Sequence, residues 1–156
     1  MGAIRTKLTA SGFNPEQPFQ SRTNLSVAEK GKKYSVKFEP PADCGVYAID
    51  GDVIKQGCRC DKLVVTEPRL GKDGGIEIFV ELKGKNVSHA IEQLETTLQH
   101  PLFRNKPAGI CRAARIVAQH YPHNTGNSVL ERAKQRFLKS YQCDLRTCHS
   151  GVAETL

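Results

Sequence analysis

Apolar and polar positions alternate most regularly between residues 76 and 83. The even-numbered positions of this segment are all aliphatic: Ile76, Ile78, Val80 and Leu82. The odd-numbered positions are mostly charged: Glu77, Phe79, Glu81 and Lys83. Successive side chains of a β-strand point to opposite faces, so the pattern predicts a strand that places Glu81 and Lys83 on the same side of a sheet.

Periodicity and turn residues predict the other elements of the chain. Apolar residues at three- and four-residue spacing indicate helices, and β-branched runs next to turn residues indicate strands. The predicted elements are a short helix at 25–33, a hairpin of strands 46–49 and 53–55 around Asp50-Gly51, a strand at 59–66, a helix at 86–99, a strand at 110–120 and a helix at 128–141.

The order of these elements predicts the fold class and the domain organisation. Residues 1–24 show neither helical nor strand periodicity, so we expect an arm or a wrapping loop there. Residues 25–156 are enough for one hydrophobic core and read as a single domain. Helices and strands alternate in it as in an α/β protein with a mixed central sheet flanked by helices.

Two carboxylates and an amine are predicted to meet at one end of that sheet. Asp61 lies in phase with Leu63 and Val65 near the start of its strand. If this strand pairs with the segment at 76–83 as an antiparallel hairpin, Asp61 becomes a neighbour of Glu81 and Lys83. Two such carboxylates suit a hard divalent cation, Mg²⁺ or Mn²⁺, and the amine suits an attacking water. The alternative is a plain surface ion pair between Glu81 and Lys83.

These residues resemble the motif of the PD-(D/E)xK nuclease superfamily, which includes many restriction endonucleases and Holliday-junction resolvases. The resemblance rests on Asp61, on Glu81-Leu82-Lys83 after nineteen intervening residues, and on the helix that follows. It covers roughly residues 25 to 120. It implies a restriction-endonuclease-like α-β-β-β-α-β core and a metal-dependent deoxyribonuclease. We favour endonuclease over exonuclease action, a choice that the residues leave open.

The same resemblance implies roles for individual residues. Asp61, Glu81 and the carbonyl of Leu82 would bind the metal, and Lys83 would serve the attacking water. Glu29 fits the glutamate that many members carry in the first helix, although it could instead complete a capping box with Ser26. Gln93 fits the glutamine found on the helix after the lysine.

The positive charge of the chain is concentrated in its last third. Between residues 104 and 146 there are nine Lys or Arg and two acidic residues, and this excess equals the whole net charge of +7. A basic segment of this kind fits the phosphate backbone of DNA, or else a solvated surface. We expect phosphate contacts from the helical stripe Arg132, Arg136 and Lys139, and from Arg112 and Arg115.

Cysteines and histidines suggest a different class of protein, a zinc-stabilised interaction module. Cys58 and Cys60 form one cluster, with Cys44 a further candidate, and Cys143, Cys148 and His149 form another. Neither cluster has the CxxC spacing of common zinc sites, so small half-buried thiols are the competing interpretation. His120 and His123 are expected in a loop after a strand, where one of them could contact phosphate.

Composition limits the location and the partners. The chain is 38% hydrophobic and 25% charged, and no apolar run approaches the roughly 20 residues of a membrane span. No secretion signal is visible, so we expect a cytoplasmic protein. We expect its partner to be DNA and not a membrane. Homodimerisation is left open. The rival to a nuclease is a catalytically inactive protein of the same fold that binds nucleic acid or a protein partner.

Overall fold

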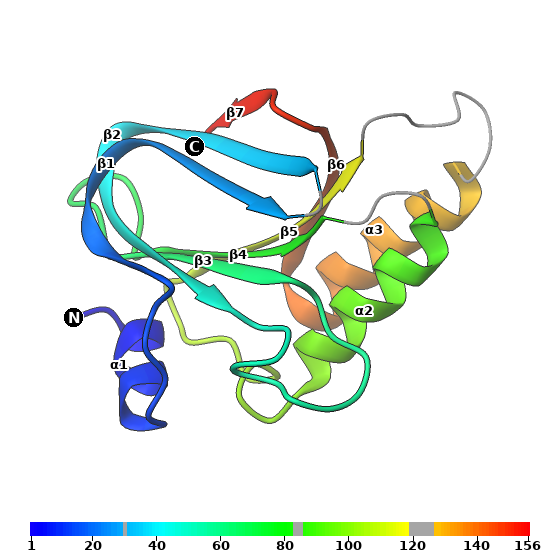
Figure 1. Cartoon of the computed structure of the whole chain (residues 1–156), viewed down its shortest axis with the longest axis horizontal. Coiled ribbons are helices and arrows are strands. Elements are labelled where there is room, and N and C mark those ends of the chain that lie inside the picture. The colour runs from blue at the N-terminus through cyan, green and yellow to red at the C-terminus, as the bar shows by residue number, and fades with distance from the viewer. Residues whose placement is uncertain (30, 83–85, 119–126) are drawn as a thin grey trace.

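The computed structural model describes residues 1–29, 31–82, 86–118 and 127–156, and it shows an α/β fold (Figure 1). In these ranges there are three helices and one open, mixed sheet of seven strands. The elements in chain order are α1 (Ala3–Ala10), β1 (Gln17–Glu29), β2 (Lys32–Ala48), β3 (Lys62–Thr66), β4 (Ile76–Glu81), α2 (Val87–Gln99), β5 (Cys111–Ala118), α3 (Asn127–Tyr141), β6 (Cys143–His149) and β7 (Ala153–Thr155).

The sheet combines an antiparallel half with a parallel half. Strands follow one another in the order β1-β2-β3-β4-β5-β6, and β7 pairs with β2 off this path. Neighbours from β1 to β4 are antiparallel, whereas β4, β5 and β6 run parallel. Helices α2 and α3 provide the crossovers that parallel neighbours need, and they lie side by side on one face (Figure 1).

Two hydrophobic clusters fill the two sides of the sheet. One includes Phe79 of β4 and residues of all three helices, such as Leu8, Leu94 and Phe137. The other lies under the curled β1–β2 hairpin. It contains the aliphatic residues at alternate positions from β4 onwards: Ile76, Ile78, Val80 and Leu82. This separation confirms a strand at 76–81 and the opposite faces predicted for Phe79 and for the aliphatic residues, whereas the predicted face of Lys83 lies outside the described residues.

Several predicted elements lie where the periodicity places them. The structure confirms strands within 59–66, 76–83 and 110–120, and a helix that spans most of 86–99. Asn86 caps this helix because its side-chain oxygen accepts a hydrogen bond from the His89 N–H at 3.1 Å. In the described part of the chain no helix is both long and apolar enough to cross a membrane.

The N-terminal third departs from the prediction. The described residues between 25 and 33 form no helix: residues 25–29 end β1, where Leu25 and Val27 are buried and Ser26 is exposed, and residues 32 and 33 begin β2. The expectation that residues 1–24 lack regular structure is also wrong, since they include α1 and the first part of β1. Residues 53–55 form no strand. They lie in a turn in which Asp50 and Ile54 make an isolated bridge.

Candidate functional site

Asp61 and Glu81 meet at the end of the sheet, beside the last residue of β4. The backbone N–H of Leu82 donates to Asp61 Oδ2 at 2.8 Å and to Glu81 Oε1 at 3.2 Å. The Asp61 N–H donates to the Val80 carbonyl at 3.1 Å, so it continues the antiparallel pairing of β3 and β4 by one residue. Both side chains are buried, Asp61 at 2% exposure and Glu81 at 0%. The predicted meeting of these two carboxylates is therefore confirmed.

The third member of the predicted site, Lys83, lies outside the described residues, so its role stays a prediction. Leu82 immediately before it is buried in the cluster beneath the β1–β2 hairpin. The carbonyl proposed as a metal ligand thus belongs to a residue whose side chain anchors the end of β4.

Helix α2 holds the segment that carries Asp61. Thr97 Oγ1 accepts a hydrogen bond from the Cys60 N–H at 2.9 Å, and Gln93 Nε2 donates to the Arg59 carbonyl at 3.1 Å. Gln93 is buried at 6% exposure, and within the described ranges its Oε1 has no hydrogen-bond partner. Gln93 therefore lies beside the segment that leads into Asp61, and its Oε1 is available as a hydrogen-bond acceptor.

Two thiols, Cys58 and Cys60, lie near the carboxylate pair. Burial raises the pKa of Cys58, and the charges of Glu92 and Glu81 raise it further. Burial also raises the pKa of Cys60, and the charges of Glu81 and Asp61 add to that rise. Cys60 directly precedes Asp61 in the chain, so its place beside that carboxylate follows from the sequence, whereas the proximity of both thiols to Glu81 arises only in the fold.

Glu29 does not occupy the place expected for it. It is the last residue of β1, opposite Lys32 of β2, and not part of a first helix. Its Oε2 is buried and has no hydrogen-bond partner in the parts of the chain that the structure describes. The resemblance-based role for Glu29 in a first helix is therefore wrong, and so is the helical capping box with Ser26.

Arg112 and Arg115 are buried, which corrects the expectation that they form part of an exposed basic surface. Arg112 pairs with Glu77, its neighbour in register on β4, and donates to the Phe103 carbonyl at 2.7 Å. Burial raises the pKa of the Glu77 carboxyl, with the Arg112 charge opposing that rise.

Arg115 is 1% exposed and is the centre of a second buried network. It donates from Nε and Nη2 to the two oxygens of Glu154, at 2.7 and 3.1 Å. Glu154 also accepts from the Tyr34 hydroxyl at 2.9 Å, so β7 is fastened to β2 and β5. Burial lowers the pKa of Arg115, but the Glu154 carboxylate outweighs that effect and raises it. Both arginines thus stabilise the fold.

The predicted basic stripe of α3 is exposed. Arg132, Arg136 and Lys139 all face solvent. Arg136 also donates from Nε and Nη2 to the Glu95 carboxylate of α2 at 2.7 and 3.1 Å. Arg132 and Lys139 are therefore the members of the stripe best placed for phosphate contacts.

All six cysteines are free thiols. Within the described ranges no group of three or more His, Cys, Asp or Glu side chains is arranged to hold a metal ion. This holds for both cysteine clusters and for the carboxylate pair taken without further ligands. Burial raises the pKa of Cys143 to about 12 and that of Cys148 to about 11. His120 and His123 lie outside the described residues.

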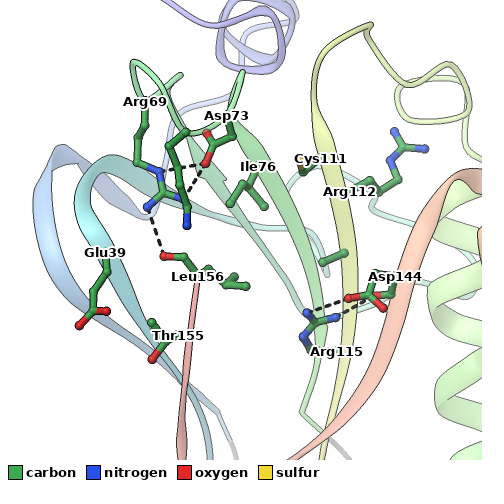
Figure 2. Close-up of a pocket in the computed structure, with 12 residues that line it drawn as sticks. Glu39, Arg69, Asp73, Ile76, Cys111, Arg112, Arg115, Asp144, Thr155 and Leu156 are labelled. Atoms are coloured by element: carbon green, nitrogen blue, oxygen red, sulfur yellow. Dashed lines mark hydrogen bonds and ion pairs between the residues drawn. The ribbon is translucent and has the colours of Figure 1, made fainter.

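A pocket of about 440 Å³ lies at the opposite end of the sheet, where β5 and β6 begin (Figure 2). Arg69 is held there by Asp73, with Nη2 to Oδ2 at 2.6 Å, and by the Leu156 carbonyl at 3.2 Å. Arg115 of β5 lies beside Asp144 of the neighbouring strand β6, at 3.4 Å (Figure 2). Because these two guanidinium groups already have carboxylate partners, we do not assign the catalytic site to this pocket.

Comparison with known proteins gives no relative to guide the assignment: no family model, no curated protein and no solved structure matches this chain.

Proposed function

We propose that the protein is a metal-dependent DNA nuclease that hydrolyses phosphodiester bonds at a PD-(D/E)xK-type site. The observation that carries the proposal is the convergence of Asp61 and Glu81 on one backbone N–H at the end of β4. Two buried carboxylates in such proximity repel each other unless a cation or a proton offsets their charge.

The donor set fits a hard divalent cation. Asp61, Glu81 and the Leu82 carbonyl supply oxygen ligands, which Mg²⁺ and Mn²⁺ prefer over nitrogen or sulfur. With two carboxylates as its protein ligands, Mg²⁺ usually keeps several waters, so a larger protein cage is not required. When bound, such an ion lowers the pKa of a coordinated water and stabilises charge on a phosphate.

The chain's own residues would orient the reaction. Lys83, two residues beyond Glu81 in the chain, would donate hydrogen bonds to the attacking water and stabilise developing negative charge. Gln93 would offer its Oε1 to the same water or to substrate, because its Nε2 is fixed on the Arg59 carbonyl. Thr97 positions Asp61 through the Cys60 N–H.

The arrangement of elements supports the same proposal. Helix α1 precedes an antiparallel run that ends in β4, then α2 leads to β5, which lies parallel to β4. This order accommodates an α-β-β-β-α-β core made of α1, β2, β3, β4, α2 and β5, with β1, β6 and β7 as additional strands. The exposed Arg132 and Lys139 of α3 supply positive charge for a phosphate backbone.

One observation favours the rival function, a catalytically inactive protein of this fold that binds nucleic acid or a protein partner. The described residues contain no group of three acidic, histidine or cysteine side chains that could hold a metal. The two functions differ in one measurable outcome, because an inactive protein binds DNA without cleaving it.

The proposal is tested by incubating the protein with supercoiled, linear and branched DNA in Mg²⁺ or Mn²⁺, with EDTA as the control. We expect metal-dependent strand cleavage of at least one substrate. DNA binding without cleavage of any of the three, in either metal, would favour the inactive rival. Gel filtration of the same sample tests homodimerisation.

A further inference from the structure

A second, smaller pocket lies where α2 and α3 both end. It measures about 270 Å³ and is formed by the loop after α2 and by the last turn of α3. The residues that line it are Arg104, Asn105, Lys106, Lys139, Ser140, Tyr141 and Gln142. Three of the seven are cationic, none is acidic, and the other four can form hydrogen bonds. We call this the basic pocket.

Contacts inside the molecule hold the walls of the basic pocket in place. Lys106 Nζ donates to the Ile110 carbonyl at 2.7 Å and is half-buried, so its charge is fixed at the rim. Tyr141 receives a hydrogen bond from Gln99 at 2.8 Å and donates to Glu95 at 3.0 Å, which fixes its ring. Arg104 and Lys139, in contrast, are exposed.

Gln142, which lines the basic pocket, has an unusual backbone conformation. Its φ of 53° lies in the left-handed region, where glycine is favoured. A non-glycine residue in this region costs of order 1 kcal/mol. A glutamine at this position adds an amide to the pocket lining that a glycine could not provide.

Helix α2 links the basic pocket to the segment that carries Asp61. Thr97 in its last turn accepts a hydrogen bond from the Cys60 N–H, and Gln99 at its end donates to Tyr141 in the wall of the pocket. Helix α3 runs in the same direction as α2, because Arg136 pairs with Glu95 and Tyr141, further along α3, contacts Gln99, further along α2. Figure 1 shows the two helices side by side.

Exposed positive charge continues along α3 from the basic pocket. Arg132 lies one turn from the start of the helix, and Lys139, at the rim of the basic pocket, follows seven residues later on the same face, about 10 Å along the axis.

We infer that the basic pocket binds a backbone phosphate of the nucleic acid. This inference rests on the proposed function, because it treats the protein as a DNA-binding nuclease whose carboxylate pair is the cleavage site. The pocket would fix the register of the duplex without reading its sequence.

The test measures DNA binding with cleavage disabled. Fluorescence anisotropy at several salt concentrations gives the slope of log affinity against log salt for the Asp61→Asn protein in EDTA. The same background is then combined with Arg104→Ala and Lys139→Ala. The matched control carries Lys37→Ala and Lys72→Ala, which remove two lysines near Glu39 on the other side of the molecule.

We expect the Arg104→Ala, Lys139→Ala variant to flatten the slope by about two units, since each lost phosphate contact removes about 0.9. The control should change it by less than half a unit.

Equal slopes for the two charge variants on long duplexes would overturn the inference, as would an absence of DNA binding by the Asp61→Asn background. A second arm follows the backbone amide signals of Ser140 and Gln142 by NMR. Inorganic phosphate that shifts these signals, together with an unchanged DNA slope, would assign the pocket to a free anion and overturn the backbone assignment. A flattened slope in a protein that never cleaves DNA would support the pocket and refute only the nuclease.

Discussion

Asp61 and Glu81, twenty residues apart in the chain, accept hydrogen bonds from the same backbone N–H, that of Leu82. The arrangement follows from the register of β3 and β4, in which Lys62 lies opposite Val80 and Asp61 one step further towards Glu81. Two buried carboxylates in such proximity repel each other unless positive charge lies between them. The pair is therefore a place where a divalent cation would be stabilising.

The role proposed for Lys83 separates chemistry from binding. Lys83→Ala should lower the turnover number for DNA about a hundredfold while changing DNA affinity little, because the amine acts on the water and on the transition state. Single-turnover kinetics and anisotropy measure the two quantities. Lys55→Ala, at an exposed lysine, is the control for loss of a positive charge. A defect in affinity with normal turnover would reassign Lys83 to phosphate contact.

Thr97 should act as a positioning residue for Asp61. Thr97→Val leaves the buried Cys60 N–H without its acceptor, so we expect a loss of about 1–3 kcal/mol in the free energy of unfolding. We also expect a drop in kcat with KM nearly unchanged, since Asp61 follows Cys60 directly.

Thr97→Ser keeps the hydroxyl and should restore both quantities. If Thr97→Ser restores stability but not kcat, or if Thr97→Val leaves kcat at the parental value, the link between α2 and Asp61 is wrong.

The Arg115–Glu154 pair should carry much of the stability of the β7 region. Glu154→Gln leaves the buried Arg115 guanidinium without its carboxylate, and removing one partner of a buried pair costs about 3–5 kcal/mol. Urea unfolding gives the difference. Glu131→Gln removes only the partner of Lys134 on the surface of α3 and should cost less than about 1 kcal/mol. Comparable losses in the two variants would show that the Arg115 network contributes little.

Alkaline pH should destabilise the protein through Cys143. Burial raises its pKa from 9.0 to about 12 in the folded state, so the folded protein favours the neutral thiol. This contribution is fully present below pH 9 and is lost as the pH rises from 9 towards 12. Between pH 9 and 10.5 the loss is about 2 kcal/mol.

The difference between the parent and Cys143→Ala isolates this contribution from other groups that titrate at alkaline pH. We expect the free energy of unfolding of the parent to fall more steeply above pH 9 than that of Cys143→Ala. Cys111→Ala, at an exposed cysteine, should follow the parent. Parallel pH profiles for all three proteins would contradict the burial effect at Cys143.

The parts of the site that were predictable are those set by strand geometry. The alternation in β4 determines the face of Glu81, and the in-phase position of Asp61 before Leu63 and Val65 determines its neighbour once the hairpin pairs. Both inferences need only local periodicity and one antiparallel register. The same reasoning locates α2, whose apolar stripe includes Ile91 and Leu94.

Tertiary burial decided the features that were missed. Residues 25–33 carry a capping-box pattern, yet Leu25 and Val27 alternate with exposed neighbours because the β1–β2 hairpin covers the sheet. Arg112 and Arg115 look like basic surface residues when the charges are counted along the chain. Their partners, Glu77 and Glu154, lie 35 and 39 residues away and become neighbours only in the folded sheet.

The most direct test of the central claim is the rate of Mg²⁺-dependent nicking of supercoiled DNA by Asp61→Asn and Glu81→Gln, compared with Asp52→Asn. Asp52 is exposed in the turn after β2, so Asp52→Asn removes the same charge away from the carboxylate pair. We predict that both site variants remain folded by circular dichroism and lose activity at least a hundredfold, because each loses a ligand charge, and that the control cleaves at the parental rate. Parental nicking by folded Asp61→Asn or Glu81→Gln protein would contradict the assignment of the site.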